Sequence, residues 1–360
     1  MENFNLKKIN LKNLNYNISY IKTLIGNKKI CAMVKADAYG HGLERIVKSL
    51  NDVDFFGAAN LKEALEVRKI NKQAKILIVG KTTQFEICAK NNVSVTISSL
   101  DELKFLIKNL HNYAKINIHF KVNCGMNRYG FSSFSQFKDA YKLAVLNNVN
   151  VEGVFTHFSC IGEDKEQFEK QKLKFLKFLQ YIPKNQIPII HVGGSGVIFE
   201  KNFKTAYNLP SYNILFDMAR VGIALYGYPP FKTSHKLKKV MKIESPIVQI
   251  NTLKKGEFLG YGLGFKAKQD MKIAVLPLGY ADGMRRDLTG KIKVKYCKNK
   301  KTYFCKVLGK ICMDCMFIDI SKVPDAKVGD RIIVMDNAEH FAKAAGTISY
   351  EILTNFSKMR

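Results

Sequence analysis

Residues 33–42 read Met33-Val34-Lys35-Ala36-Asp37-Ala38-Tyr39-Gly40-His41-Gly42. They follow an apolar run over 30–34 that predicts a buried strand, which puts Lys35 at the C-terminal end of that strand. In sheets of parallel strands, ligands bind beyond the carboxyl ends of the strands. This position predicts that the lysine meets a ligand. Taken alone, the stretch is better explained by a solvated surface lysine, because lysine is the commonest surface residue in this chain.

Strand-like runs alternate with amphipathic stretches along the first 225 residues. This alternation is typical of repeated β-α units around a parallel sheet. Eight strands are the number in a closed (β/α)8 barrel, whose catalytic groups come from the loops that follow the strands. The predicted strands cover 30–34, 54–59, 75–79, 93–97, 115–122, 151–158, 187–192 and 213–221, and the predicted helices include 61–70, 100–110, 135–146 and 165–180.

After about residue 228 the pattern changes to strands joined by turns, with little helix. This pattern predicts a separate, mainly antiparallel β domain. The pair Pro229-Pro230 marks the boundary, so the expected domains are 1–230 and 231–360. The predicted strands of the second domain cover 242–253, 272–278, 291–297, 302–307, 316–320 and 331–335.

The chain is strongly basic, with 58 Lys and Arg against 30 Asp and Glu among 360 residues and a formal charge of +28. Such a charge attracts nucleic acid, anionic lipid or acidic ligands. A nucleic-acid site would concentrate its cations on one element, interleaved with aromatic residues. Here lysine is spread over the whole chain, which favours a compositional bias, and we expect no nucleic-acid partner.

The compartment is indicated by three features of the sequence. The N-terminus has no apolar signal core, and no run approaches the ~20 apolar residues that cross a bilayer. The eight cysteines are scattered through apolar segments, which is typical of free thiols in a reducing compartment. We therefore expect a cytoplasmic protein without a membrane partner.

Glycines follow the last two strands of the predicted barrel. Gly193-Gly194-Ser195-Gly196 comes after the seventh strand and Gly222 after the eighth, where barrels usually bind phosphate through backbone amides. A lysine at a strand end can form a Schiff base with a carbonyl group. Pyridoxal 5′-phosphate carries both an aldehyde and a phosphate, so it fits both halves of this site.

Several segments, in order along the chain, resemble the alanine racemases, a family of barrel-fold enzymes that depend on pyridoxal phosphate. The lysine segment alone would be less specific, because barrel-fold decarboxylases also carry a lysine after the first strand. The segments are Val34 to Gly42, Lys121-Val122-Asn123-Cys124-Gly125-Met126-Asn127-Arg128, Thr156-His157-Phe158, Ala219-Arg220-Val221-Gly222-Ile223, Tyr261-Gly262, Gly279-Tyr280-Ala281-Asp282-Gly283, Cys312-Met313-Asp314 and Ile348-Ser349-Tyr350.

The resemblance implies two catalytic bases. Lys35 would hold the cofactor through a Schiff base and serve as the base on the face of the D-amino acid. Tyr261 would reach the active site of the partner subunit as the second base, which implies a homodimer with shared active sites. Racemisation needs a base on each face, because each removes or returns the Cα proton from its own side. From the residues alone, Tyr261 is equally compatible with a turn aromatic between two glycines.

The resemblance also implies roles in binding the cofactor. Arg220 would face the pyridine nitrogen, and a guanidinium leaves that nitrogen unprotonated because it cannot accept a proton. His157 would hydrogen-bond to Arg220, and Arg128 would contact the phenolic oxygen of the cofactor and the carboxylate of the substrate. Lys121 matches a lysine that is often carbamylated and then helps to position Arg128. The remaining cofactor-binding residues, all expected at the phosphate, are Tyr39, Ser195, Gly222, Ile223 and Tyr350.

Two more residues would meet the substrate, and several positions depart from the family's pattern. Met313 would contact the substrate carboxylate of the partner subunit's site through its backbone amide, and Tyr280 would line the entrance. Asn123, Cys124 and Asn127 stand where Asp, Thr and Gly are common, and Gly194 where Asn is usual. Cys312-Met313-Asp314-Cys315 supplies two of the four ligands that zinc needs, so no metal is expected.

The function implied by the resemblance is interconversion of L-alanine and D-alanine, which supplies D-alanine for peptidoglycan. A racemase of broader specificity, acting on serine for example, stays open because loops form the walls of the pocket. A barrel-fold decarboxylase would place a carboxylate instead of Arg220 at the pyridine nitrogen. A basic binding protein without enzymatic activity would need neither Lys35 nor Tyr261.

Overall fold

The computed structural model describes residues 5–109, 115–182, 186, 189–192, 194–199, 216–231 and 236–359. Contacts between residues divide the chain into two compact units. The unit that we call the barrel unit comprises Leu14–Ala38 and Leu43–Lys238. The other, which we call the β unit, comprises Met1–Asn13, Tyr39–Gly42 and Lys239–Arg360.

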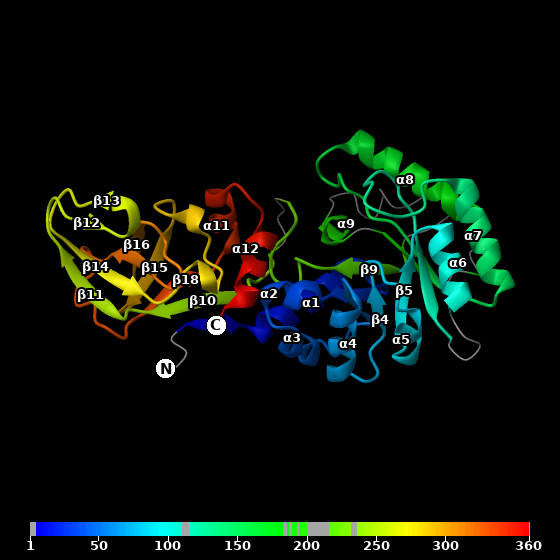
Figure 1. The fold of residues 1–360 in the computed structure, drawn as a ribbon, viewed down its shortest axis with the longest axis horizontal. Coiled ribbons are helices and arrows are strands. Elements are labelled where there is room, and N and C mark those ends of the chain that lie inside the picture. Colours follow the sequence, from blue (N-terminus) through cyan, green and yellow to red (C-terminus); the bar gives the residue numbers. More distant parts are fainter. Residues whose placement is uncertain are drawn as a thin grey trace. The chain divides into compact units, whose positions relative to one another are not determined.

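The barrel unit is a closed barrel of eight parallel strands, as predicted. The last strand pairs with the first, with Lys29 opposite Met218, and helices cover the outside of the strands (Figure 1). Strands such as β5 are buried on both faces, which explains their continuous apolar character. The strands are β2 (Lys29–Met33), β3 (Phe55–Ala58), β4 (Ile76–Ile78), β5 (Val93–Ile97), β6 (Asn117–Lys121), β7 (Asn150–Phe155), β8 (Ile189–His191) and β9 (Met218–Val221).

Three of the outer helices begin at a residue that caps their free backbone amides. The side chains of Asn60, Ser133 and Asp164 accept hydrogen bonds from amides in the first turns of α4, α7 and α8. The predicted strands over 187–192 and 213–221 begin outside the described residues. The helices of this part of the chain are α1 (Leu11–Ile25), α3 (Leu43–Ser49), α4 (Leu61–Ile70), α5 (Phe85–Lys90), α6 (Leu100–Asn109), α7 (Phe134–Leu146), α8 (Lys165–Leu179) and α9 (Ser195–Phe199).

The segment after β2, α2 (Lys35–Gly40), is a turn of left-handed helix. Residues 36–39 have φ between 52° and 55°, a conformation that L-residues rarely adopt. Two carboxylates hold it in place: Glu63 accepts a hydrogen bond from the amide of Ala36 (2.8 Å), and Asp37 accepts one from the amide of Leu43 (2.7 Å). The turn therefore presents Lys35 at the end of its strand through a strained backbone.

The β unit contains an antiparallel sheet of eight strands in the order β1-β10-β18-β15-β16-β17-β14-β11, which confirms the predicted β domain. The predicted strand over 242–253 is divided in two next to Pro246, which has no N–H to donate to a neighbouring strand. The strands are β1 (Leu6–Ile9), β10 (Met241–Pro246), β11 (Gln249–Leu253), β14 (Met271–Leu276), β15 (Lys293–Lys298), β16 (Lys301–Leu308), β17 (Met316–Asp319) and β18 (Arg331–Met335), with a separate pair β12 (Phe258–Leu259) and β13 (Phe265–Lys266).

Two parts of the β unit were not predicted. Strand β1, from the start of the chain, pairs with β10, with Leu6 opposite Glu244. Two helices also lie in this unit: α11 (Ala338–Ala345) and α12 (Ser349–Asn355). The β unit is therefore built from both ends of the sequence.

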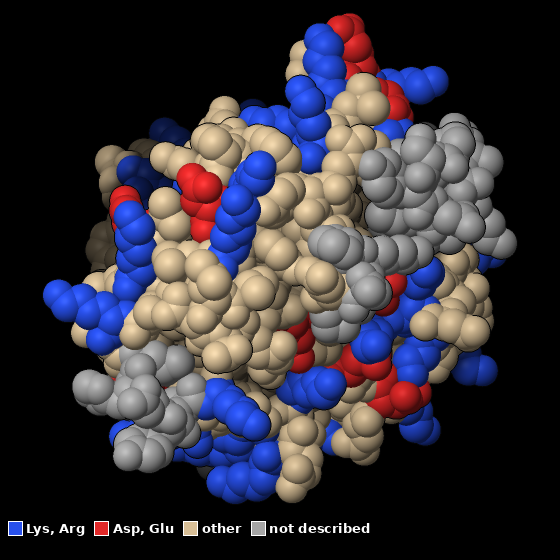
Figure 2. Space-filling model, turned by 90° about the vertical axis from the view of Figure 1, so that its right-hand side faces the viewer, with Lys and Arg blue, Asp and Glu red and all other residues tan. Residues whose placement is uncertain are grey.

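The distribution of surface charge and the state of the cysteines agree with a general excess of lysine and with free thiols. Figure 2 shows Lys and Arg side chains spread around one face, with Asp and Glu among them, rather than gathered in one patch. All eight cysteines are free. Within the described segments, no helix has the length and apolar character needed to span a bilayer.

Candidate active site

Four cationic side chains lie at or near the carboxyl ends of barrel strands. Lys35 follows β2, Lys121 ends β6, Arg128 is in the loop after β6, and Arg220 is on β9. Burial and the charges of the other three cations lower the pKa of Lys121 to about 7. Burial and the charge of Arg128 also lower the pKa of Lys35, although Glu63 opposes this effect. The four side chains therefore share one mouth of the barrel.

The mouth has a positive charge that its own acids do not balance. Lys121 is 3% exposed, and its Nζ lies 3.6 Å from the ring centre of Tyr129, so an aromatic face takes the place of a carboxylate. Among the described residues, none of Lys35, Lys121 and Arg128 forms an ion pair. Lys121 is the buried member of the three, and a cation that is buried without an ionic partner is costly. The mouth is thus suited to an anionic ligand.

Arg220 is 5% exposed and is held by its own unit. Its Nη1 donates to Nδ1 of His191 (2.7 Å) and to the carbonyl of His191 (3.1 Å), and its Nη2 donates to the carbonyl of Thr156 (2.6 Å). In the described structure Arg220 thus bonds to His191 rather than to His157, the partner expected from the sequence. Burial and the charge of Arg220 lower the pKa of His157 to about 3, so this histidine is neutral.

The hydrogen bonds continue from His191 into the barrel interior. His191 Nε2 lies 2.8 Å from Nδ1 of His119, and Nε2 of His119 lies 2.9 Å from Oε2 of Glu152. The hydroxyl of Ser94 donates to the same carboxylate oxygen (2.6 Å). Sequence reasoning missed these residues. Their signal was the presence of two histidines and a glutamate inside otherwise apolar strands.

The segment after β9 forms a second group with Ser195. The hydroxyl oxygen of Ser195 accepts from the amides of Gly222 and Ala224, both at 3.3 Å. Ser195 is the first residue of α9, and Ile223, which lies between Gly222 and Ala224 in the sequence, is buried. Gly193 lies outside the described residues. The expected phosphate contacts Ser195, Gly222 and Ile223 are thus brought together in the barrel unit.

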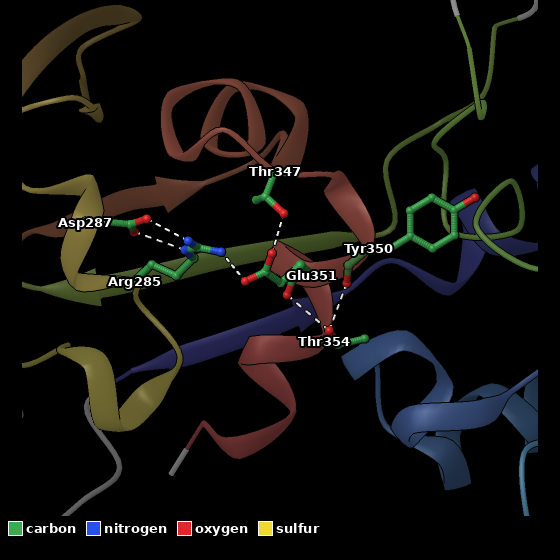
Figure 3. A network of polar contacts seen from close by, with 6 residues as sticks. All are labelled: Arg285, Asp287, Thr347, Tyr350, Glu351 and Thr354. Carbon is green, nitrogen blue, oxygen red and sulfur yellow. Dashed lines mark hydrogen bonds and ion pairs between the residues drawn. The ribbon is translucent and has the colours of Figure 1, made fainter. Parts of the chain in front are cut away.

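Tyr39 and Tyr350, the other two expected phosphate contacts, are brought together in the β unit. Their ring centres are 6.0 Å apart, and burial raises the pKa of Tyr350 to about 12. Helix α12 carries Tyr350 and is anchored by Glu351, which pairs with Arg285 and accepts a hydrogen bond from Thr347. Figure 3 shows this network, with the Tyr350 side chain pointing away from it. The network fixes the helix and does not include the phenol ring.

Three more expected residues are exposed on loops of the β unit. Tyr261 is 70% exposed, Met313 53% and Tyr280 43%. The loop of Met313 is bonded to that of Tyr280, because the amides of Tyr280 and Ala281 donate to the carbonyls of Cys312 and Met313 (both 3.0 Å). At Gly279 a Cβ would come within 2.2 Å of the Met313 carbonyl, so only glycine fits there.

Both parts of the chain are similar to known proteins. The family model described as "Alanine racemase, N-terminal domain" matches residues 9–230, and "Alanine racemase, C-terminal domain" matches residues 240–360. The chain belongs to the alanine racemase family. The matches cover both the barrel and the β domain.

Individual members of the alanine racemase family are similar over almost the whole chain. An alanine racemase of Clostridium novyi is 35% identical over 98% of this chain and 92% of its own length, and one of Borreliella burgdorferi is 34% identical over 97% and 94%. Among solved structures, an alanine racemase of Clostridium difficile has a TM-score of 0.87 at 32% identity, covering 98% of this chain and 93% of its own. That of E. faecalis has a TM-score of 0.89 at 26% identity, covering 99% and 97%.

The departures from the common alanine racemase pattern are accommodated locally. Asn127 has a φ of 55°, a left-handed conformation that asparagine tolerates better than most residues, which explains how it replaces a common glycine. The Asn123 side chain accepts from the amides of Gly125 and Asn127 (3.1 and 3.0 Å) and therefore organises the loop before Arg128. A Cβ at Gly194 would meet its neighbours at 3.6 Å, so space does not explain glycine there.

Cys312 and Cys315 do not extend to a metal site within the described part of the chain. No group of three or more His, Cys, Asp or Glu side chains that could hold a metal ion occurs there.

Proposed function

We propose that the chain is a pyridoxal-phosphate-dependent alanine racemase that interconverts L-alanine and D-alanine and supplies D-alanine for peptidoglycan. The observation that carries the proposal is that the same barrel mouth holds Lys35, whose pKa is lowered, and Arg220, which has no carboxylate partner there. A barrel-fold decarboxylase would be expected to use an acid in that place.

The residues present fit pyridoxal phosphate. Lys35 supplies an amine for the aldehyde, the Ser195 hydroxyl beside the amides of Gly222 and Ala224 can donate to a phosphate, and Arg220 can donate to a pyridine nitrogen. The unbalanced positive charge of the mouth fits an anionic group. When bound, the cofactor withdraws electrons from the Cα atom of the amino acid and so makes its proton removable.

The protein's own residues would then handle the proton and the carboxylate. Lys35, with its lowered pKa, is the base on one face of the substrate, and Arg128 holds the carboxylate from the mouth. Arg220, as a donor that cannot give up its proton, leaves the pyridine nitrogen unprotonated and limits side reactions. His157 is neutral and adds no charge to the mouth.

The second base would come from another copy of the chain. Tyr261 is exposed between Gly260 and Gly262, on the same unit as Tyr280 and Met313. We assign Tyr261 as the base of the partner subunit's site, with Met313 contacting the substrate carboxylate and Tyr280 at the entrance, in a homodimer.

Lys121 is the residue for which we propose carbamylation. A neutral amine reacts with CO₂ to form a carbamate and release a proton, and a pKa of about 7 provides that neutral amine near neutral pH. The new negative charge would compensate part of the positive charge of the mouth and hold Arg128.

The test combines a spectrum with two assays. Purified protein is scanned from roughly 300 to 500 nm before and after borohydride, and D-alanine formed from L-alanine is measured. We expect a band that borohydride abolishes, with cofactor fixed to Lys35 in a mass spectrum of the digest. Cofactor without racemisation would move the proposal to another amino acid or to decarboxylation, and failure to bind cofactor would overturn it.

Mixing two inactive variants tests the shared site. If Tyr261 acts in the partner subunit, a mixed dimer of Lys35→Ala and Tyr261→Phe has one site with both native bases, so mixing restores activity. No recovery would contradict a shared site. Tyr261→Phe alone should slow proton removal from L-alanine far more than from D-alanine, measured by deuterium exchange.

A further inference from the structure

A chain of hydrogen bonds runs from Arg220 into the barrel and ends at a carboxylate. It passes from Arg220 Nη1 to His191 (2.7 Å), from His191 to His119 (2.8 Å) and from His119 to Glu152 (2.9 Å). Arg220, both histidines and Glu152 are each at most 9% exposed. Water does not reach this chain freely, so its members depend on one another.

The two ends of the chain determine the position of every proton in it. A guanidinium can only donate and an ionised carboxylate can only accept. His191 Nδ1 must therefore accept from Arg220, which leaves its Nε2–H to donate to Nδ1 of His119. His119 in turn donates its Nε2–H to Glu152. Both imidazoles are then neutral and carry the proton on Nε2, and no other assignment satisfies all three bonds.

The charges agree with this assignment. Burial and the charge of Arg220 hold the pKa of His191 well below its usual value, so it is neutral. Burial opposes ionisation of Glu152, but hydrogen bonds from His119 and Ser94 outweigh it and lower the pKa of the carboxyl group. Glu152 is thus the negative charge that balances Arg220, at a distance of two imidazole rings.

The barrel backbone is adapted to this chain at two neighbouring positions of β7. The register between β6 and β7 shifts so that Ile118 lies opposite Val151 and His119 opposite Gly153, which leaves Glu152 as the extra residue of a bulge. Bulges of this kind turn a side chain in a new direction. At Gly153 a Cβ would lie 2.4 Å from Nδ1 of His119, so glycine makes the room for the imidazole.

An aromatic ring completes the arrangement. The ring of Phe155 stacks on His191, with centres 4.6 Å apart and planes at 15°, and Cζ of Arg220 lies 4.8 Å from the same ring. The guanidinium is therefore fixed by stacking and by three hydrogen bonds, and the described residues use three of its five N–H groups. The other two are left for a ligand.

We propose that Glu152, His119 and His191 are positioning residues that fix the orientation of the Arg220 guanidinium through this one-directional chain. Glu152 sets the tautomer of both histidines, and His191 passes the constraint to the guanidinium. The effect of Arg220 on the cofactor rests on the proposed function. The assignment of the histidine tautomers rests on the hydrogen bonds alone.

The first test reads the protons directly. Protein labelled with ¹⁵N-histidine is examined by NMR as purified, and His119 and His191 are assigned by replacing each with glutamine. We expect both imidazoles to be neutral, with Nε2 protonated and Nδ1 not. A proton on Nδ1 of either residue would overturn the proposal. This readout needs no catalysis, so it stands apart from a failure of the proposed function.

The second test compares two buried acids. Glu152→Gln removes the charge at the end of the chain, and Glu244→Gln is the matched control, since Glu244 is 5% exposed in the β unit and pairs with Lys8 and Lys242. The Gln amide oxygen can still accept from His119 but carries no charge. We expect Glu152→Gln to shift the absorbance maximum of the bound cofactor and to lower kcat about tenfold with little change in KM, which is the lower end of the effect of changing an outer hydrogen-bonded partner at metal sites. The control should change neither.

A milder variant keeps the test decisive if Glu152→Gln does not fold. Ser94→Ala removes one hydrogen bond to the carboxylate and leaves the chain itself intact, so a smaller shift in the same direction is expected. An unchanged spectrum and unchanged kcat in a folded Glu152→Gln protein would show that the carboxylate only supports the fold, and would overturn the positioning role.

Discussion

The barrel interior and the barrel mouth handle charge in opposite ways. At the border between the two regions, the buried cation Arg220 is linked through His191 and His119 to the anion Glu152 in the interior. At the mouth, Lys35, Lys121 and Arg128 are gathered without an ion pair among the described residues. The interior is complete by itself, whereas the mouth is complete only with an anion bound. The difference identifies the part of the barrel that awaits a ligand without reference to any relative.

The largest loss of stability is expected from removing the carboxylate of Glu152 in the barrel interior. Glu152→Leu removes the only charged acceptor of this hydrogen-bond chain and leaves the buried donors His119 Nε2–H and Ser94 Oγ–H unpaired, at a cost of about 1–3 kcal/mol for each donor. Urea unfolding of the protein without cofactor measures this loss. Glu166→Leu is the control, because Glu166 pairs with Lys170 at the surface and should change stability little. Equal losses in both variants would contradict the comparison.

Removing a cation from the mouth should raise the free energy of unfolding instead of lowering it. Lys121→Met replaces a buried, unpaired ammonium by an apolar side chain of similar size, and such changes stabilise by about 1–4 kcal/mol. Lys121 has a pKa of about 7 when folded and 10.5 when unfolded, so the unfolded state binds more protons between these values. Stability of the native protein should therefore rise with pH across that window.

The gain from Lys121→Met should accordingly be largest below pH 7 and disappear near pH 10.5. Unfolding is followed at several pH values in buffer free of CO₂, so that the amine is not carbamylated. A gain that does not vary with pH would show that the lysine charge is not its source.

The difference between the barrel interior and the mouth can also be tested by packing, with one glycine from each region. Gly153→Ala places a Cβ 2.4 Å from His119 Nδ1 and 2.8 Å from the carbonyl of Ile189, so overpacking of about 1–3 kcal/mol is expected. Gly194→Ala near the mouth meets its neighbours at 3.6 Å and should stay within about 0.5 kcal/mol. Thermal unfolding of both variants is the measurement, and a larger loss at Gly194 would reverse the expected order.

The smallest effect is expected from inorganic phosphate. If Ser195 and the backbone at Gly222 and Ala224 form a phosphate site, phosphate at ten times its Kd should stabilise the protein without cofactor by about 1.4 kcal/mol. Unfolding in phosphate is compared with unfolding in chloride at equal ionic strength. An equal effect of the two salts would argue against a specific phosphate site.

The sequence predicted the elements of the fold better than it predicted their contacts. Periodicity reports which segments are buried, and it located the strand that ends before Lys35 and the changes of pattern near Pro229. It could not show that β1 pairs with β10, because that contact joins distant parts of the chain. The bulge at Glu152 and the left-handed turn after Lys35 have no periodic signature.

The candidate site was predicted to a similar extent. Lys35, Arg220 and Ser195 stand out because polar residues follow apolar strands. The expected contact of Arg220 with His157 is not among the described hydrogen bonds, in which Arg220 donates to His191 at the end of β8. Periodicity does not tell which of the two histidines turns toward the guanidinium. Resemblance to a family predicts which residue types occur at the site. The partner and direction of each hydrogen bond require the structure.

The left-handed turn after Lys35 limits how this lysine could be moved to another protein. Four consecutive L-residues in that conformation cost about 4–8 kcal/mol. The segment keeps its shape because the carboxylates of Glu63 and Asp37 hold two of the surrounding amides. A designer who grafts residues 35–40 onto a different barrel must therefore transplant Glu63 and its helix as well. Otherwise the turn will relax from the left-handed conformation and will no longer fix the direction of the lysine side chain.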